Sequence, residues 1–282
     1  MLLAPCIIYF LALGIFPLIY NVYLSLQWIE QTAGPGAQRF VGLENYFKLF
    51  RDVRFWATLK NTFVFVISTV GLEFVLGLGL ALILNREMKG GKIFRVLLVI
   101  PSMLTPVAVG YTFRMILNPT WGPMNHFLSF VGIPPVHWLD SPALSLFSII
   151  LIDIWEWTPF MFLFLLAGLQ GLPKDSYEAA IIDGASAWQV FRYITLPLLY
   201  PVIIVACLLR AIDAFKIFDT IYVTTAGGPG ISSESVTMYA QAVAMRYMSL
   251  GYGSTIATML FIMVVTVGVI FINRVRKQRE VA

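Results

Sequence analysis

The chain has 282 residues, of which 59% are hydrophobic and only 12% are charged, and its mean hydropathy is +0.83. Soluble domains carry about 25% charged residues, so this composition excludes a soluble globular protein and indicates an integral membrane protein. The net charge of +4 does not indicate nucleic-acid binding, because membrane proteins concentrate Lys and Arg in their cytoplasmic loops.

Six apolar segments are long enough to cross a bilayer, since a spanning helix needs about 20 residues at a rise of about 1.5 Å each. They cover residues 2–26, 61–84, 94–117, 143–169, 198–223 and 253–273. The first, from Leu2 to Leu26, has no basic stretch before it and is expected to be a retained span rather than a removed signal peptide. The sequence therefore predicts an all-α membrane protein, with six spans in one transmembrane domain that covers residues 1–282.

The distribution of Lys and Arg predicts the orientation of these spans. With both termini in the cytoplasm, ten Lys and Arg residues fall on the inner side and six on the outer side. The basic tail from Arg274 to Arg279 follows the last span directly, which is typical of a cytoplasmic end. We therefore expect residues 171–197 and both termini to face the cytoplasm. The expected outer loops, which could form a docking surface, are residues 27–60, 118–142 and 224–252.

A polar segment of residues 173–197 separates the fourth and fifth spans. Lys174 to Asp183 is expected to form a short helix, and Gly184 permits a sharp turn after it. A second short helix from Ala187 to Ile194 is expected to end at Pro197. This pattern predicts either a helical protrusion that enters a groove on a soluble protein or an amphipathic connector that lies on the membrane.

The sequence Glu178-Ala179-Ala180-x-x-Asp183-Gly184-Ala185, followed by Ile194-x-Leu196-Pro197, resembles the EAA loop of the permease subunits of bacterial ABC importers. Residues 210–222 and 225–229 resemble the carbohydrate branch of that family, as do residues 40–46 and 121–125. The resemblance therefore covers essentially the whole chain. The chain lacks the large inserted outer domain of the maltose subunit, which argues against maltose as its particular substrate.

This resemblance implies the fold of type I ABC importer permeases, in a bacterial cytoplasmic membrane, and a division of labour among subunits. Two permeases, usually unlike chains, would form the pore, and an extracytoplasmic binding protein would deliver the sugar. Two ATPase subunits would bind ATP and Mg and contact the EAA segment. The coupling residues that the resemblance implies are Glu178, Ala179, Ala180, Asp183, Gly184, Ala185, Leu196 and Pro197.

The residues of the chain agree that ATP hydrolysis belongs to a partner. A phosphate-binding loop has the pattern G-x-x-x-x-G-K-[ST], and Gly90-Gly91-Lys92 lacks both the preceding Gly and the following hydroxyl residue. Cys6 and Cys207 both lie in apolar runs, so neither a disulfide nor a metal site is expected. We therefore expect no cofactor in this chain, and no nucleophile–base or metal constellation of an enzyme.

Several ionisable residues lie deep within the predicted spans, where a charge costs about 2.5–3.5 kcal/mol on insertion scales. Arg210 and Asp213 share a face of the fifth span because they are three residues apart. Glu156 lies at a similar depth in the fourth span. Lys216 and Asp219, nearer the outer end, are expected to pair with each other.

Aromatic rings beside such charges suit a sugar, because rings stack on its C–H faces while charged groups bond its hydroxyls. The expected substrate-binding residues are Arg210, Asp213, Trp157, Glu156, Phe160 and Ile217, with Ser102 and Thr105 as further candidates. The alternative is that Arg210 and Asp213 only neutralise each other and hold the bundle together. Glu73 is interpreted as structural.

The sequence therefore predicts the permease subunit of an ATP-driven importer for a disaccharide or small glycoside, which works by alternating access. A permease for glycerol-3-phosphate or another polar solute is an alternative, because Arg210 could pair with an anion. An ion-coupled secondary transporter would also use buried carboxylates, but it has no use for the 173–197 segment.

Overall fold

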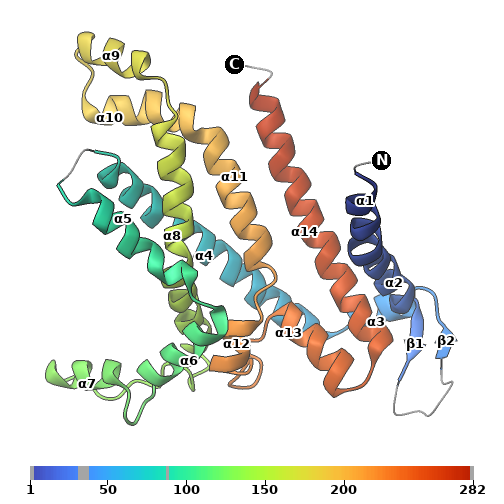
Figure 1. Cartoon of the computed structure of the whole chain (residues 1–282). Coiled ribbons are helices and arrows are strands. Elements are labelled where there is room, and N and C mark those ends of the chain that lie inside the picture. Colours follow the sequence, from blue (N-terminus) through green and yellow to red (C-terminus); the bar gives the residue numbers. More distant parts are fainter. Residues whose placement is uncertain (1–2, 31–37, 87–88, 280–282) are drawn as a thin grey trace.

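The computed structural model describes residues 3–30, 38–86 and 89–279 (Figure 1). Leu2 and the side chains of the basic tail, Arg274 to Arg279, lie outside what it describes. Its helices are α1 (Ala4–Phe10), α2 (Phe16–Ser25), α3 (Glu44–Phe50), α4 (Val53–Leu84), α5 (Gly91–Val99), α6 (Pro106–Ile116), α7 (Pro123–Phe130), α8 (Ser145–Gln170), α9 (Lys174–Ile182), α10 (Ala187–Val190), α11 (Leu196–Ala214), α12 (Asp219–Thr224), α13 (Val236–Gln241) and α14 (Leu250–Arg279). Its strands, β1 (Gln27–Ile29) and β2 (Gln38–Phe40), pair antiparallel with Gln27 opposite Phe40.

Within the described residues, five helices are long and apolar enough to span a membrane, and a bent pair could form a sixth span. The five are Ala4–Ser25, Val53–Leu84, Ser145–Gln170, Ala187–Ala214 and Leu250–Asn273. The short helices α9 and α10 project from one end of this bundle, the hairpin end (Figure 1). The strands, α3, α7, α12 and α13 gather at the opposite end, the loop end (Figure 1). The prediction of an all-α membrane protein is therefore confirmed.

The expected third span, residues 94–117, is broken. The helices Gly91–Met103 and Pro106–Ile116 meet at an angle of 94°. Thr105, between them, is extended with a ψ of 140°, because a proline ring disfavours the helical conformation in the residue before it. The predicted third span is therefore sharply bent between its two halves.

Two span boundaries also differ from the prediction. Helix α4 begins at Val53 rather than near residue 61, because Asp52 caps it by accepting hydrogen bonds from the backbone N–H groups of Arg54 and Phe55 at 2.9 and 3.2 Å. Helix α11 ends at Ala214, whereas the predicted span continued to residue 223. The chain leaves the helix before Asp219 and starts α12 there.

Pro197 does not end the second short helix of the 173–197 segment as expected. The chain is helical without interruption from Ala187 to Ala214. A π-helical turn from Phe191 to Thr195 precedes the proline, and the N–H of Leu196 bonds to the carbonyl of Phe191. Pro197 is therefore an interior residue of this continuous helix, and its missing N–H falls directly after the π-helical turn.

Helices α4, α8 and α11 pack closely around an apolar core that includes Leu78, Met161, Leu165 and Leu199. Gly77 of α4 lies so close to α8 that a Cβ there would come within 2.9 Å of Met161. Small residues permit this approach of helix backbones in membrane proteins. The packing of α4, α8 and α11 sets the positions of the side chains at the candidate site.

Candidate functional site

Arg210 lies at the centre of an ion cluster in the interior of the bundle, and its side chain is only 2% exposed. Its Nε and Nη2 donate hydrogen bonds to the two carboxylate oxygens of Glu73 on α4, at 2.8 and 3.1 Å. Nη2 also donates to Asp153 on α8. Arg210 therefore ties α4, α8 and α11 together at one level.

The remaining side of the guanidinium faces Asp213 and Trp157. Nη1 donates to Asp213 at 3.4 Å, and the guanidinium lies 5.1 Å from the centre of a Trp157 ring. The other oxygen of Asp213 lies 3.3 Å from Nζ of Lys216. The predicted pairing of Lys216 with Asp219 is wrong, because Lys216 follows Asp213 by three residues whereas Asp219 lies beyond the break that begins α12.

A polar cavity of about 260 Å³ lies beside this cluster. The ionisable side chains that line it are Asp153, Arg210, Asp213, Lys216 and Asp219, together with the apolar Pro106, Trp157 and Ile217. Four of the expected substrate residues, Arg210, Asp213, Trp157 and Ile217, therefore meet at one cavity. Sequence reasoning missed Asp153, although the cost of a charge inside a span applies to it as it does to Glu156.

The other four expected substrate residues are not among the described residues that line the polar cavity. Glu156 is buried, and within the described part of the chain neither carboxylate oxygen has a hydrogen-bond partner. Phe160 packs edge-to-face on Trp157, with ring centres 6.3 Å apart. Ser102 donates to the carbonyl of Val99 at 2.9 Å, and Thr105 is exposed at the bend before α6.

A larger cavity of about 520 Å³ lies among α4, α5 and α8, and it is apolar. Leu76, Leu97, Pro101 and Phe162 contribute to its wall. Such a wall offers few partners for the hydroxyl groups of a polar solute, which need hydrogen bonds when water is removed. The smaller polar cavity is therefore the better candidate for a solute site.

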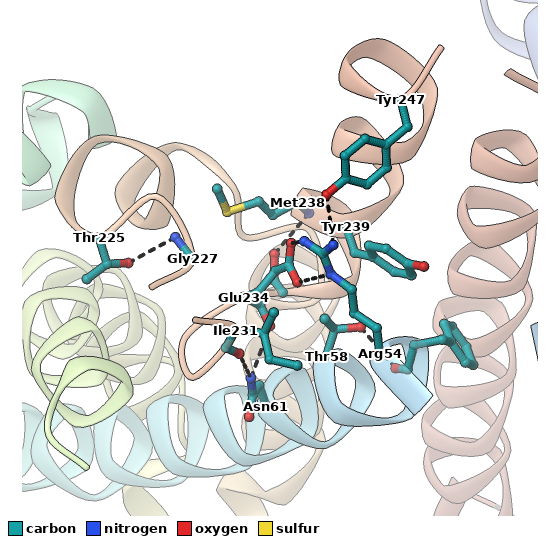
Figure 2. Close-up of polar contacts among 12 residues, drawn as sticks. Arg54, Thr58, Asn61, Thr225, Gly227, Ile231, Glu234, Met238, Tyr239 and Tyr247 are labelled. Carbon is teal, nitrogen blue, oxygen red and sulfur yellow. Dashed lines mark hydrogen bonds and ion pairs between the residues drawn. The ribbon is translucent and has the colours of Figure 1, made fainter. Parts of the chain in front are cut away.

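At the loop end, the chain between α12 and α13 is fixed to α4. Nε and Nη2 of Arg54 donate to the carboxylate of Glu234 at 2.9 and 2.7 Å, and Nη1 donates to the hydroxyl of Tyr247 at 2.9 Å (Figure 2). The side-chain amide of Asn61 donates to the carbonyls of Ile231 and Glu234 at 2.9 and 3.3 Å (Figure 2). These contacts hold residues 225–235 against the first turns of α4.

A second contact at the loop end joins α4 to α13 and α14 through Asp52. Its Oδ2 accepts hydrogen bonds from the hydroxyls of Tyr239 and Tyr252, both at 2.5 Å. Burial by itself would raise the pKa of Asp52, but these bonds and those from the backbone N–H groups of Phe55 and Arg54 hold it below its ordinary value. The loop end is therefore tied together by ionised side chains.

The 173–197 segment forms two short helices joined at Gly184, which has a φ of +71°. The N–H of Gly184 bonds to the carbonyl of Ile181, and that of Ala185 bonds to the carbonyl of Ala180, at 3.1 and 3.0 Å. A helix that ends with a residue in the left-handed conformation strongly favours glycine at that position. Ser186 caps the next helix, α10, by exchanging capping bonds with Gln189.

The surface of this segment is both polar and apolar. Glu178, Ala179 and Asp183 are exposed, whereas Ala180 is buried. Ile182, at the end of α9, is 86% exposed. Ala185 and Leu196 are half-buried and Pro197 is exposed. An exposed apolar surface on a projecting element is typical of a protein-binding site.

The comparisons with known proteins agree with this architecture. Residues 47–280 match the family described as the binding-protein-dependent transport system inner membrane component. The trehalose/maltose transport system permease protein of Thermococcus litoralis is 42% identical, over 86% of this chain and 81% of that protein. The sulfoquinovosyl glycerol transport system permease protein of Agrobacterium fabrum is 37% identical, over 98% of this chain and 89% of that protein.

Solved structures show the same fold. A bacterial ABC transporter involved in the import of the acidic polysaccharide alginate matches with a TM-score of 0.85 at 23% identity, over 98% of this chain and 94% of that chain. The chain therefore belongs to the family of inner membrane components of binding-protein-dependent transport systems. It is a multi-pass permease subunit of an ABC importer, and the family predicted from the 173–197 segment is confirmed.

Proposed function

We propose that this chain is one of two permease subunits that carry a neutral carbohydrate into the cell, and that the polar cavity is part of the path. The observation that carries the proposal is the charge balance around Arg210. Its guanidinium is already bonded to Glu73 and Asp153, so the cavity offers hydrogen-bonding groups and the ring of Trp157 but no unpaired guanidinium. The sugar permeases among the relatives support a carbohydrate as the substrate.

This charge balance disfavours an anionic solute such as glycerol-3-phosphate. The second cation of the cavity, Lys216, pairs with Asp213. Asp219 adds another carboxylate to the wall. A phosphate would meet more carboxylates than cations, and like charges brought into a low-dielectric site repel strongly. Sugar hydroxyls can instead donate to the oxygens of Asp213, whose side chain is 47% exposed.

The size of the cavity fits a site shared between two subunits. Its volume of about 260 Å³ lies below the roughly 300–1,000 Å³ of complete small-molecule pockets. A second permease, facing this wall across the pore, would supply the remaining surface. The expected contribution of Glu156, Phe160, Ser102 and Thr105 would then be to support the wall rather than to touch the sugar.

The 173–197 segment is proposed to project into the cytoplasm and to dock on one of two partner ATPase subunits, which bind ATP and Mg. Both termini would share that side of the membrane, and an extracytoplasmic sugar-binding protein would dock at the loop end. The segment connects α8 with α11, and these helices carry Asp153 and Arg210. A displacement of the segment on ATP binding therefore reaches two walls of the polar cavity, which is what alternating access requires.

The test is ATP-driven uptake by the complete transporter, with its binding protein, in proteoliposomes. We expect uptake of a neutral sugar to need ATP and to be unaffected by added glycerol-3-phosphate. Asp213→Asn should lower uptake about tenfold, the effect of losing roughly 1.4 kcal/mol of interaction, while basal ATP hydrolysis is kept. The matched control is Asp140→Asn, an exposed carboxylate at the loop end. Wild-type uptake by the Asp213 variant, or transport of the phosphate ester, would contradict the proposal.

A further inference from the structure

Helix α7 turns one polar residue, Asn125, towards the protein and leaves large apolar side chains exposed, whereas a surface helix usually buries its apolar face. Asn125 of α7 is only 7% exposed. Its side-chain nitrogen donates to the carbonyls of Pro119 and Val136, at 3.2 and 3.0 Å. Its side-chain oxygen accepts from the N–H of Val136 and from Nε1 of Trp138, at 3.2 and 3.0 Å. Asn125 therefore fixes α7 to the loop that follows this helix.

The opposite side of α7 is apolar and exposed. Phe127, Phe130 and Val131 follow one another at helical spacing, so they share a face. The side chains of Phe130 and Val131 are 74% and 75% exposed. Trp121, just before the helix, is exposed as well. An aromatic surface of this kind, held in place by a buried asparagine, marks a contact with an apolar partner.

The position of α7 identifies that partner as lipid. The helix lies across the direction of the spans at the loop end, next to the ends of α6 and α8 (Figure 1). Residues 115–139 contain no Lys, Arg, Asp or Glu. Protein interfaces usually have a polar rim, whereas aromatic and aliphatic residues without acidic groups suit the boundary between lipid headgroups and acyl chains. Met115, in the last turn of α6, is exposed as well.

The loop that follows α7 is fixed to α6 and α8. The hydroxyl of Ser148 on α8 donates to the carbonyl of Trp138 at 2.9 Å. Trp138 also packs against a cluster that includes Val109 of α6 and Ile152 of α8. The loop after α7 is therefore part of the packed core.

We propose that α7 is an interfacial anchor that inserts Phe127, Phe130 and Val131 into the leaflet at the loop end. Such an anchor fixes the depth of α6, whose first residue, Pro106, lines the polar cavity. The anchor does not depend on which solute the cavity carries.

The test uses nitroxide labels on single cysteines in the complete transporter, reconstituted in phosphatidylethanolamine–phosphatidylglycerol vesicles. Cys6 and Cys207 are first replaced by Ser. A label at Phe130→Cys should be more accessible to lipid-soluble oxygen than to a water-soluble nickel chelate, by a ratio several-fold higher than that of the matched control at Ser129→Cys. ATP-driven uptake of each labelled protein reports that it is correctly assembled.

Two results would overturn the proposal. Equal access of the chelate to both labels would place the apolar face in water. A label at Phe130 that is shielded from both oxygen and chelate would mean that a protein subunit covers this face. Phe127→Cys, on the same face, gives the same comparison if the Phe130 variant fails to assemble.

Discussion

Arg210 and Glu73 lie 137 residues apart in the sequence and form a two-point ion pair inside the helix bundle. Asp153 contacts the same guanidinium from a third helix. The buried cluster thus contains two carboxylates for one guanidinium. Removal of different members must therefore have different consequences.

Arg210→Met should lower the free energy of unfolding by about 3–5 kcal/mol, because it leaves Glu73 and Asp153 buried together without a cation. Glu73→Gln should lower the free energy of unfolding by a smaller amount, since Arg210 and Asp153 remain as a balanced pair. Thermal unfolding of the purified protein in detergent measures both changes.

The control for this prediction neutralises the whole cluster. Arg210→Met combined with Glu73→Gln and Asp153→Asn should be more stable than Arg210→Met alone, because replacing a complete buried ion pair is often neutral or stabilising. A Glu73→Gln variant as unstable as Arg210→Met would show that excess carboxylate charge is not what limits stability here.

Gly184→Asn should reduce ATP-driven uptake at least tenfold without lowering the stability of the permease itself. Asparagine tolerates the left-handed backbone at this φ of +71°, and nothing in the described chain lies within 4 Å of an added Cβ. A loss of uptake would therefore come from the partner that contacts the turn.

Gly132→Asn is the matched control, since Gly132 has a φ of +76° and equally free surroundings at the loop end. It should transport at the wild-type rate. Wild-type uptake by the Gly184 variant would count against docking of the 173–197 segment on an ATPase.

Arg54→Lys should loosen residues 225–235, because a lysine cannot make the two parallel bonds to Glu234 and the bond to Tyr247. The Arg54–Glu234 pair is partly exposed, so we expect the free energy of unfolding to fall by about 1–2 kcal/mol, a value between those of typical exposed and buried pairs. Hydrogen–deuterium exchange should rise in this loop. Lys60→Met, an exposed residue of the same helix, should leave the exchange rate unchanged.

Asp52→Asn should destabilise the protein by about 1–3 kcal/mol at neutral pH, because Asn keeps the helix cap but loses the charge-assisted bonds from Tyr239 and Tyr252. The pKa of Asp52 is lowered in the folded protein. Its contribution is therefore complete above the ordinary aspartate pKa of about 3.9 and is lost as the pH falls through the lower folded value.

The measurement is thermal unfolding of both proteins at neutral pH and at progressively acidic pH. The difference between wild type and Asp52→Asn should shrink on acidification. A difference that stays constant down to the lowest pH would show that the charge of Asp52 contributes nothing.

The class of the protein follows from its amino-acid sequence, because hydropathy measures the transfer of side chains into lipid and depends little on tertiary contacts. The six apolar segments and the Glu178–Pro197 pattern were sufficient for the fold and family. The same local reasoning selected Arg210, Asp213, Trp157 and Ile217 as candidates, and these four residues line one polar cavity.

The pairing of these residues depends on how the helices pack against one another. The partners of Arg210 come from α4 and α8, and no spacing rule within one helix could assign Glu73 and Asp153 to it. The bend at Pro106 and the continuous helix through Pro197 show the same limit, because proline removes one hydrogen bond in either case. The packing of the neighbouring helices decides whether the chain bends at the proline or stays helical without that hydrogen bond.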